Sequence, residues 1–392
     1  MNKTIGILHL TFPYGGAETA TIQLARELSA EGFHIYVFCT DFRENRAAGA
    51  AGHYQVEVMP DTAHPNSARN ARFLAERSRQ LGIGCLCISF NGFLPLMRQL
   101  RTSGGPRLVY IQHGQPFWEK QSRLDAGARR GFMKFRVACI DRVKEKLFGY
   151  YSRQWEKAYA ALYENCDAYV TLHPQYSREI QKAVGCDGAK FTAIPNMVEP
   201  AGPPPETKKK QLLYSGRMSY NDKRVDRLIR VWAAIHARIP DWELVLVGDG
   251  KERKQLQALS ARLALPKIRF EGWQKDVTRY YREASVICLT STFESFGLCL
   301  TEGMSQGCVP VAFDCSAGVA DIVRGNGELV PPFNLKSYAD ALLRLTTDDA
   351  YRETLRLRSL DAVRRFYPQE IIPRWTGLFE RLQAESQENP TE

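Results

Sequence analysis

The stretch that decides the fold is residues 211–250, where QLLYSGR (211–217) and WELVLVGDG (242–250) flank RVDRLIRVWAAIHARI (224–239). Each flanking run is short, apolar and ends at a glycine, which is typical of a buried strand that runs into a turn. The central run spaces its apolar residues as a helix does. A strand, a helix and a strand in this order predict a βαβ unit with parallel strands.

The same alternation extends in both directions along the chain. The strand candidates are TIGILHL, FHIYVFC, YQVEVM, CLCISF, RLVYIQH, AYVTL and FTAIP in the first half, and KIRFEGW, SVICLTS and VPVAF further on. The helix candidates of the first half are residues 16–30, 66–81, 93–102 and 175–184, and an unusually long helical stretch at 117–164. Two doubly wound, Rossmann-like α/β domains in tandem are the simplest account.

Residues 199–210, EPAGPPPETKKK, divide the two halves. The prolines cannot continue a helix or a central strand, and three consecutive lysines resist burial. We therefore predict a first domain over 1–198, a linker over 199–210 and a second domain over 211–368. Pro368 ends that domain, and a last helix is expected over 369–385.

The composition is that of a globular protein, with 392 residues of which 44% are hydrophobic and 24% charged. No apolar run approaches the roughly 18 residues of a spanning helix, and the N-terminal run resembles a strand more than a signal peptide. We therefore expect a cytoplasmic protein. The ten cysteines are scattered, so reduced buried thiols are expected, with Cys85 and Cys87 on one face of a strand.

Glycines stand where several strands end. Gly15 and Gly16 precede a helix, where backbone N–H groups can converge on an anion, although a tight structural turn would look the same. Gly216 and Arg217 end another strand, and Lys223 follows in a polar loop. Two cations at such a strand end suit a diphosphate, with solvated loop cations as the alternative. The next strand ends at a second pair of glycines, Gly248 and Gly250. The third glycine of a dinucleotide-binding fingerprint is missing after them, which disfavours an NAD-dependent enzyme.

The most informative segment is residues 291–310, STFESFGLCLTEGMSQGCVP. Glu294 lies in the loop after a strand, and Glu302 lies eight positions later on the following helix, so both carboxylates can face one crevice. Gly297, between them, allows close approach of a ligand. Two acceptor groups at this place suit a ligand rich in hydroxyls. The alternative is one helix-capping and one solvated glutamate.

The segment ESFGLCLTE resembles the E-x7-E motif of the family 4 retaining glycosyltransferases. FEGW before it, EGMSQGCVPVAF after it, and GGAE (15–18), IPNMV (194–198), SGR (215–217) and VGDG (247–250) resemble the same family in order and spacing. The resemblance spans nearly the whole chain. It implies a GT-B fold, in which two Rossmann-like domains face a cleft and the C-terminal helix returns to the first domain.

The resemblance also implies the function: transfer of a sugar from a nucleotide-sugar donor to a glycan or lipid-linked acceptor. The expected setting is cell-surface polysaccharide or glycolipid synthesis. By position, Arg217 and Lys223 would bind the diphosphate, Glu302 the ribose and Glu294 the transferred sugar. Backbone amides of Phe296 and Gly297 would help to hold that sugar, and Gly16 would approach the diphosphate. His113, in VYIQHG, resembles the histidine that touches the donor sugar; a structural histidine is the alternative.

The family usually has glycine after the lysine, whereas Arg224 follows Lys223 here, so either side chain could bind the phosphate. No Asp-x-Asp occurs in the sequence, and cations with helix N-termini can neutralise a leaving diphosphate. We therefore expect no metal and no cofactor beyond the donor co-substrate. The family's mechanism gives Glu294 an electrostatic role and not a nucleophilic one.

The net charge of +10 is concentrated in residues 115–160, which hold 11 basic and 5 acidic side chains. Apolar residues of this segment share one helical face, and basic residues occupy the remainder. The apolar positions are Phe132, Phe135, Cys139, Val143, Leu147 and Tyr151; the basic positions are Arg129, Arg130, Lys134, Lys144 and Arg153. A core-facing helix with a solvated cationic back and a helix on an anionic membrane surface both fit this pattern.

Two other function classes compete with glycosyl transfer. A nucleotide-sugar epimerase could share the fold and donor site, but it would convert the donor without an acceptor. A nucleic-acid binder could account for the basic pI, yet the charge is confined to one segment and no recognised nucleic-acid motif accompanies it.

Overall fold

The computed structural model describes residues 2–13, 15–43, 52–125, 131–199 and 202–388. The chain divides into two compact units. The first comprises residues 1–120, 144–197 and 368–392, and the second comprises 121–143 and 198–367. Residues 121–143, which the sequence analysis assigned to the first domain, thus group with the second unit.

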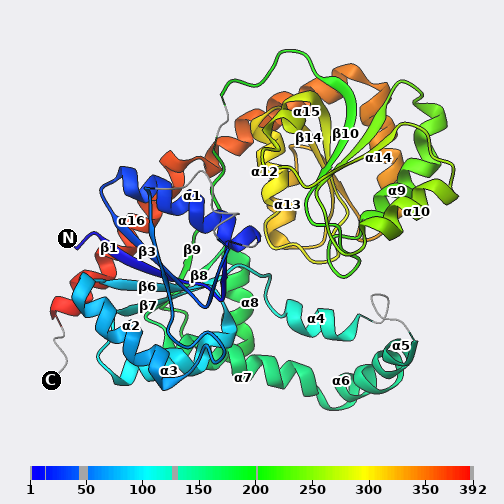
Figure 1. The fold of residues 1–392 in the computed structure, drawn as a ribbon. Coiled ribbons are helices and arrows are strands. Elements are labelled where there is room, and N and C mark those ends of the chain that lie inside the picture. The colour runs from blue at the N-terminus through cyan, green and yellow to red at the C-terminus, as the bar shows by residue number, and fades with distance from the viewer. Residues whose placement is uncertain (1, 14, 44–51, 126–130, 200–201, 389–392) are drawn as a thin grey trace. The chain divides into compact units, whose positions relative to one another are not determined.

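The first unit is built on a parallel seven-stranded sheet with the order β5-β3-β1-β6-β7-β8-β9 (Figure 1). The strands are β1 (Thr4–Leu8), β3 (His34–Cys39), β5 (Gln55–Val58), β6 (Cys85–Ile88), β7 (Arg107–Gln112), β8 (Ala168–Thr171) and β9 (Phe191–Ala193). A small two-stranded sheet pairs β2 (Thr11–Phe12) with β4 (Asp41–Phe42). The outward order from β1 in both directions is that of a doubly wound sheet.

Helices cover both faces of this sheet. On one face, α1 (Gly16–Ala30) and α16 (Pro368–Glu388) pack on strand residues that include Ile5, Cys85 and Cys87. On the other face lie α2 (Ala68–Leu81), α3 (Leu94–Thr102), α7 (Tyr150–Asn165) and α8 (Pro174–Val184). Cys85 and Cys87 are buried in one cluster, while Leu86 belongs to the other, so the predicted alternation of this strand is confirmed.

Helix α16 is part of the core of the first unit although it comes last in the chain. Its Ile371, Phe379 and Leu382 are almost fully buried against the sheet. The Gln383 amide accepts a hydrogen bond from the backbone N–H of Asn2 at 2.9 Å and donates one to the Asn2 carbonyl at 2.7 Å. The helix begins one residue before, and ends three residues after, the predicted range of 369–385.

The second unit has a parallel six-stranded sheet with the order β12-β11-β10-β13-β14-β15. The strands are β10 (Lys209–Ser215), β11 (Glu243–Val247), β12 (Ile268–Gly272), β13 (Ala284–Leu289), β14 (Val309–Phe313) and β15 (Glu328–Val330). The helices are α9 (Val225–Ile235), α10 (Arg253–Arg262), α11 (Thr278–Glu283), α12 (Leu298–Ser305), α13 (Ala317–Val323), α14 (Leu335–Thr347) and α15 (Asp349–Ala362). The strand-helix-strand unit predicted from residues 211–250 is therefore present as β10, α9 and β11.

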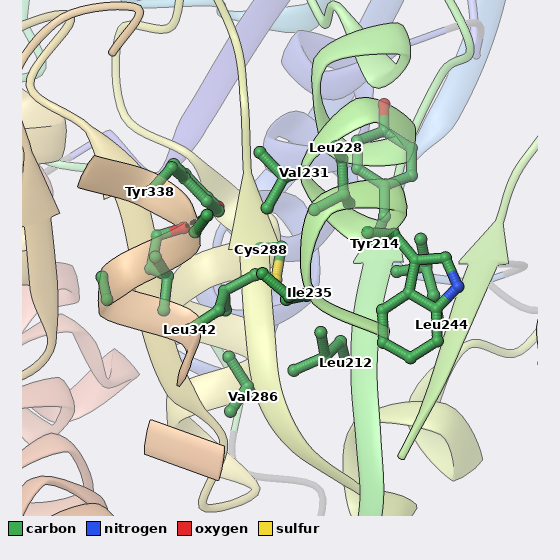
Figure 2. Packing of buried hydrophobic residues seen from close by; sticks show 14 of the residues in the cluster. Leu212, Tyr214, Leu228, Val231, Ile235, Leu244, Val286, Cys288, Tyr338 and Leu342 are labelled. Atoms are coloured by element: carbon green, nitrogen blue, oxygen red, sulfur yellow. Dashed lines mark hydrogen bonds between the residues drawn. The ribbon is translucent and has the colours of Figure 1, made fainter. Parts of the chain in front are cut away.

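Figure 2 shows the core between this sheet and helices α9 and α14. Leu212, Leu244 and Val286 come from three neighbouring strands, and Leu228 and Leu342 come from the two helices. Each of these side chains is fully shielded from solvent. Burial of this apolar surface, at about 25 cal/mol per Å², fixes the strands whose ends carry the polar groups discussed below.

Two details of the second unit differ from the sequence predictions. Lys209 and Lys210, expected in the linker, are the first residues of β10, because their ammonium groups remain at the surface and pair with Glu283 (2.9 Å) and Asp241 (3.4 Å). The short edge strand β15 was not predicted, since three residues give too little periodicity to read.

The long helix predicted over 117–164 is divided into several helices. These are α4 (Trp118–Leu124), α5 (Gly131–Arg136), a π-helical turn (Val137–Asp141), α6 (Arg142–Phe148) and α7, which starts after Gly149. Gly149 has a φ of 55°, and this left-handed conformation ends α6. The predicted Arg129 and Arg130 lie outside the described residues.

The apolar face predicted for this segment does not point into a core. Phe132, Phe135, Val143 and Leu147 are 72%, 59%, 47% and 66% exposed, and Cys139 is exposed too. Of the predicted face only Tyr151 is buried. The core-facing alternative is therefore wrong for residues 132–147.

No helix in the described part of the chain combines the length and the apolar character needed to cross a bilayer.

Candidate active site

An ion pair joins two loops at the carboxyl ends of neighbouring strands in the second unit. The Lys223 ammonium donates a hydrogen bond to the Glu294 carboxylate, and the hydroxyl of Ser291 lies 3.5 Å from the same oxygen. Both side chains of the ion pair are mostly buried. Burial alone would lower the pKa of Lys223, but Glu294, Cys299 and Asp222 together outweigh this effect and the pKa is raised. Lys223 is thus a fixed cation in this site.

The backbone holds these two loops together. The Thr292 N–H donates to the carbonyl of Asp222 at 2.6 Å. The Thr290 hydroxyl lies 3.3 and 3.1 Å from the carbonyls of Lys223 and Arg224. Because β10 and β13 are hydrogen-bonded neighbours, the loops that follow them leave the sheet side by side.

The other cations of the β10 loop have carboxylate partners of their own. Arg217 is 61% exposed, and its guanidinium donates to Asp222 at 2.6 Å. Arg224, with a φ of 51°, forms a two-pronged pair with Asp226 at 3.0 and 3.1 Å. Arg224 is therefore held at the start of α9, while Lys223 is the member of the pair beside Glu294.

Glu302 lies in the same site, on α12. The Tyr281 hydroxyl donates to its carboxylate at 2.7 Å and also interacts with Ser215, the last residue of β10. Burial raises the pKa of Glu302, and the Tyr281 hydrogen bond partly opposes this effect.

The thiol of Cys299 lies among the charged groups. Burial raises its pKa to about 12, and Lys223, Glu294 and Glu302 all act on it electrostatically. The buried hydroxyl of Tyr214 is likewise subject to the charges of Glu294 and Arg217. The two predicted carboxylates and two predicted cations therefore gather around the ends of β10 and β13.

Close packing of the backbone explains the glycines at the ends of β10 and β11. A Cβ on Gly248 would come 1.9 Å from the Gly216 carbonyl oxygen, and a Cβ on Gly250 would come 2.2 Å from that of Met218. These two glycines allow the loops after β10 and β11 to touch, which is a backbone requirement independent of any ligand. Gly216 and Gly248 also have positive φ angles of 151° and 122°.

Gly297 begins helix α12 in the left-handed conformation, with a φ of 88°. The side chain of the preceding Phe296 is buried and meets the ring of Phe366 edge-on, with ring centroids 5.2 Å apart. This anchor fixes the turn that separates Glu294 from the helix carrying Glu302. In the first turn of α12 the Leu300 N–H donates to the Gly297 carbonyl at 2.8 Å.

A second polar cluster lies in the first unit, where β1, β6 and β7 end. His9 follows β1, with its Nε2 2.9 Å from the Thr21 hydroxyl and its Nδ1 3.1 Å from the Ser89 hydroxyl. Burial lowers the pKa of His9 to about 3, and the neighbouring His113 adds to this effect. Burial also lowers the pKa of His113, which follows β7, to about 4. Both imidazoles are neutral near pH 7.

Glu18 connects this histidine pair to the glycine turn. One oxygen of its carboxylate accepts from the Gly15 N–H at 2.8 Å, and the other lies 3.7 Å from Nδ1 of His9. Gly15 is extended and caps α1, which starts at Gly16. A Cβ on Gly16 would meet no atom of the protein within 4 Å, so the fold itself does not require glycine there.

The structure places the predicted residues in two groups. Those of the second unit are Gly216, Arg217, Lys223, Gly248, Gly250, Glu294, Phe296, Gly297 and Glu302; those of the first unit are Gly15, Gly16 and His113. Sequence analysis missed His9, Asp222 and Tyr281. His9 could have been found, since it follows a buried strand just as His113 does.

Comparison with known proteins identifies the family and the fold of the chain. Residues 14–201 match the profile of "Glycosyltransferase Family 4", and residues 209–348 match that of "Glycosyl transferases group 1". A solved structure from Anabaena, Alr3699/HepE with UDP and glucose, covers 98% of this chain and is itself covered completely, with a TM-score of 0.74 and 17% identity.

The fold is therefore of the GT-B class, with two Rossmann-like domains. Together the two profiles cover most of the chain, which belongs to the family 4 glycosyltransferases.

Two curated relatives are similar over part of their length. The exopolysaccharide phosphotransferase SCO2592 of Streptomyces coelicolor is 30% identical over 55% of this chain and 23% of its own. The lipopolysaccharide 1,6-galactosyltransferase of Salmonella typhimurium is 27% identical over 47% of this chain and 55% of its own. The matched regions span less than two thirds of the length of each.

Proposed function

We propose that this protein is a retaining glycosyltransferase that moves a sugar from a nucleotide-sugar donor to a glycan or lipid-linked acceptor in the synthesis of cell-surface polysaccharide or glycolipid. The observation that carries the proposal is the gathering of Lys223, Glu294 and Glu302 at the ends of β10 and β13. The names of the relatives, which include exopolysaccharide and lipopolysaccharide enzymes, support the acceptor class.

In this proposal the ion pair rearranges when the donor binds. The donor diphosphate takes Lys223 as its partner, joined by the exposed guanidinium of Arg217. The carboxylate of Glu294 then becomes an acceptor for hydroxyls of the transferred sugar. Glu302, held by Tyr281, accepts from the ribose hydroxyls. The attraction between a phosphate and a fixed ammonium group is stronger in a site shielded from solvent than in water.

The reaction needs no side-chain nucleophile. The acceptor hydroxyl oxygen attacks the anomeric carbon while the bond from that carbon to the phosphate oxygen breaks. The proton of the hydroxyl passes to the departing phosphate oxygen, which leaves as nucleoside diphosphate. Lys223 and Arg217 stabilise the negative charge that develops on that oxygen, so we propose that no metal ion is required.

The test is incubation with UDP-, GDP- and CDP-linked sugars, with and without acceptor. We expect nucleoside diphosphate and a new glycoside only when both substrates are present, with undiminished turnover in EDTA. The anomeric proton of the product, measured by NMR, reports whether configuration is retained. Interconversion of the donor sugar without acceptor would instead identify an epimerase.

A further inference from the structure

The helices between β7 and α7, together with the first residue of α7, carry many exposed apolar side chains. Its members, here called the apolar face, are Phe132, Met133, Phe135, Ile140, Val143, Leu147, Phe148 and Tyr150. They range from 40% to 72% exposed, and they make up half of the large hydrophobic residues that are exposed in the described part of the chain. A helical segment that leaves so many aromatic and aliphatic groups in water indicates a binding surface.

The acidic side chains of this segment are withdrawn from that surface. Asp141 is 1% exposed and lies 3.7 Å from the guanidinium of Arg123 and 3.8 Å from that of Arg136. Glu145 accepts hydrogen bonds from the backbone N–H groups of Tyr151 and Ser152, at 2.9 and 3.2 Å. Their negative charges are thus neutralised within the protein.

Three basic side chains, in contrast, are exposed to solvent, although the Arg142 Nε also donates a hydrogen bond to the Leu124 carbonyl at 3.2 Å. Arg142, Lys144 and Lys146 are exposed along α6, next to Val143, Leu147 and Phe148 in sequence. The Lys144 ammonium lies 5.9 Å from the ring centroid of the exposed Tyr150. Long cationic side chains can lie along an apolar surface with their charged ends at its polar margin, and tyrosine favours the same kind of boundary.

We propose that the helical segment 131–150 docks on the surface of an anionic lipid bilayer. The apolar face enters the boundary between headgroups and acyl chains, and Arg142, Lys144 and Lys146 pair with the anionic headgroups. A soluble protein partner would explain the apolar face but not the arrangement of the charges. The acidic groups lie inside and the basic groups outside, which complements the surface of an anionic membrane. This inference does not depend on the donor chemistry proposed above.

The test is sedimentation of the full-length protein with vesicles of phosphatidylcholine alone or mixed equally with phosphatidylglycerol. We expect binding to the mixed vesicles that weakens as salt is raised. Leu147→Ser should weaken this binding about ten-fold or more, whereas Leu357→Ser, whose side chain is 55% exposed on α15, should not change it.

A second pair of variants tests the charge. The double substitution Lys144→Gln, Lys146→Gln should weaken binding to the mixed vesicles by about ten-fold or more. Lys251→Gln, at a lysine that is 73% exposed in the second unit, serves as the matched control. Circular dichroism and thermal denaturation confirm that each variant is folded, as expected because none of these side chains is buried or belongs to the site.

Wild-type protein that binds both kinds of vesicle equally weakly would overturn the proposal. So would a Leu147→Ser variant that binds as the wild type does. Sedimentation velocity tests whether the apolar face instead binds a second copy of this chain. A wild type that self-associates, and that Leu147→Ser converts to a monomer with vesicle binding unchanged, would show this.

Discussion

The ammonium of Lys223 and the carboxylate of Glu294 form an ion pair although 71 positions separate them in the chain. The pair exists because β10 and β13 are adjacent in the sheet while α9, β11, α10, β12 and α11 intervene in sequence. The two charges satisfy each other, and in the proposed function the donor diphosphate replaces Glu294 as the partner of Lys223.

Glu294→Gln tests the role of the carboxylate. The amide keeps the shape of the side chain but loses its charge, so turnover should fall by about 100-fold or more if Glu294 acts in the transition state. The fold should persist, as judged by circular dichroism. Glu353→Gln, which removes a similar charge from an exposed pair on α15, is the control and should leave turnover unchanged. Near-normal turnover of Glu294→Gln would exclude the proposed role.

Lys223→Gln and Arg224→Gln together identify the phosphate ligand. Lys223 lies beside Glu294, whereas Arg224 is held by Asp226. We expect UDP affinity, measured by isothermal titration calorimetry, to fall about ten-fold or more in Lys223→Gln and to change little in Arg224→Gln. The opposite order would assign the phosphate to Arg224.

Gly16→Ala separates a ligand requirement from a folding requirement. The added methyl group meets no protein atom within 4 Å and sits at the first position of α1, so the free energy of unfolding should stay the same or rise by up to about 1 kcal/mol. Turnover should nevertheless fall if the diphosphate approaches this turn as the family resemblance implies, because the methyl group would occupy that place.

Gly250→Ala is the contrasting variant for that experiment. Its Cβ would overlap the Met218 carbonyl oxygen, so thermal denaturation should show a loss of stability of about 1 to 3 kcal/mol. If Gly16→Ala were as unstable as Gly250→Ala, the ligand interpretation of Gly16 would be lost.

His9 and His113 predict an acid-sensitive first unit. Their pKa values are lowered from an ordinary 6.5 to about 3 and about 4, so the unfolded chain binds protons that the folded chain rejects. The free energy of unfolding should therefore show no loss from these histidines above pH 6.5. It should fall as the pH drops toward 4, by up to about 1.4 kcal/mol per pH unit for each histidine.

Urea denaturation at several pH values measures this slope. His9→Gln should reduce the slope between pH 6.5 and 4, whatever its effect on stability at pH 7. An unchanged slope in His9→Gln would show that acid sensitivity arises elsewhere.

Much of the fold follows from the sequence because buried parallel strands are short apolar runs with clear ends. Cys85, Leu86 and Cys87 alternate between two cores as period-two geometry requires. The strand β15 and the start of β10 escaped prediction, because three residues carry too little pattern and because Lys209 joins a strand while its ammonium stays at the surface.

The site was predictable where chemistry follows a strand end and less so where it depends on distant partners. The positions of Lys223, Glu294 and Glu302 could be named from local pattern and family resemblance. The hydrogen bond from Tyr281 to Glu302 depends on a tertiary contact between residues 21 positions apart. The ion pair between Arg224 and Asp226 depends on the local backbone conformation. Periodicity likewise identified a face on residues 132–147 but not what that face meets.

The contribution of α16 to the first unit has a consequence for how the protein is made. Its apolar side chains complete one side of a sheet whose first strand in the chain, β1, is translated more than 350 residues earlier. Helix α1 covers part of that side early, but the part that α16 covers stays exposed until α16 has left the ribosome, so the nascent chain exposes apolar surface throughout the translation of the second unit. The second unit, which needs no part of α16, can finish folding before the first.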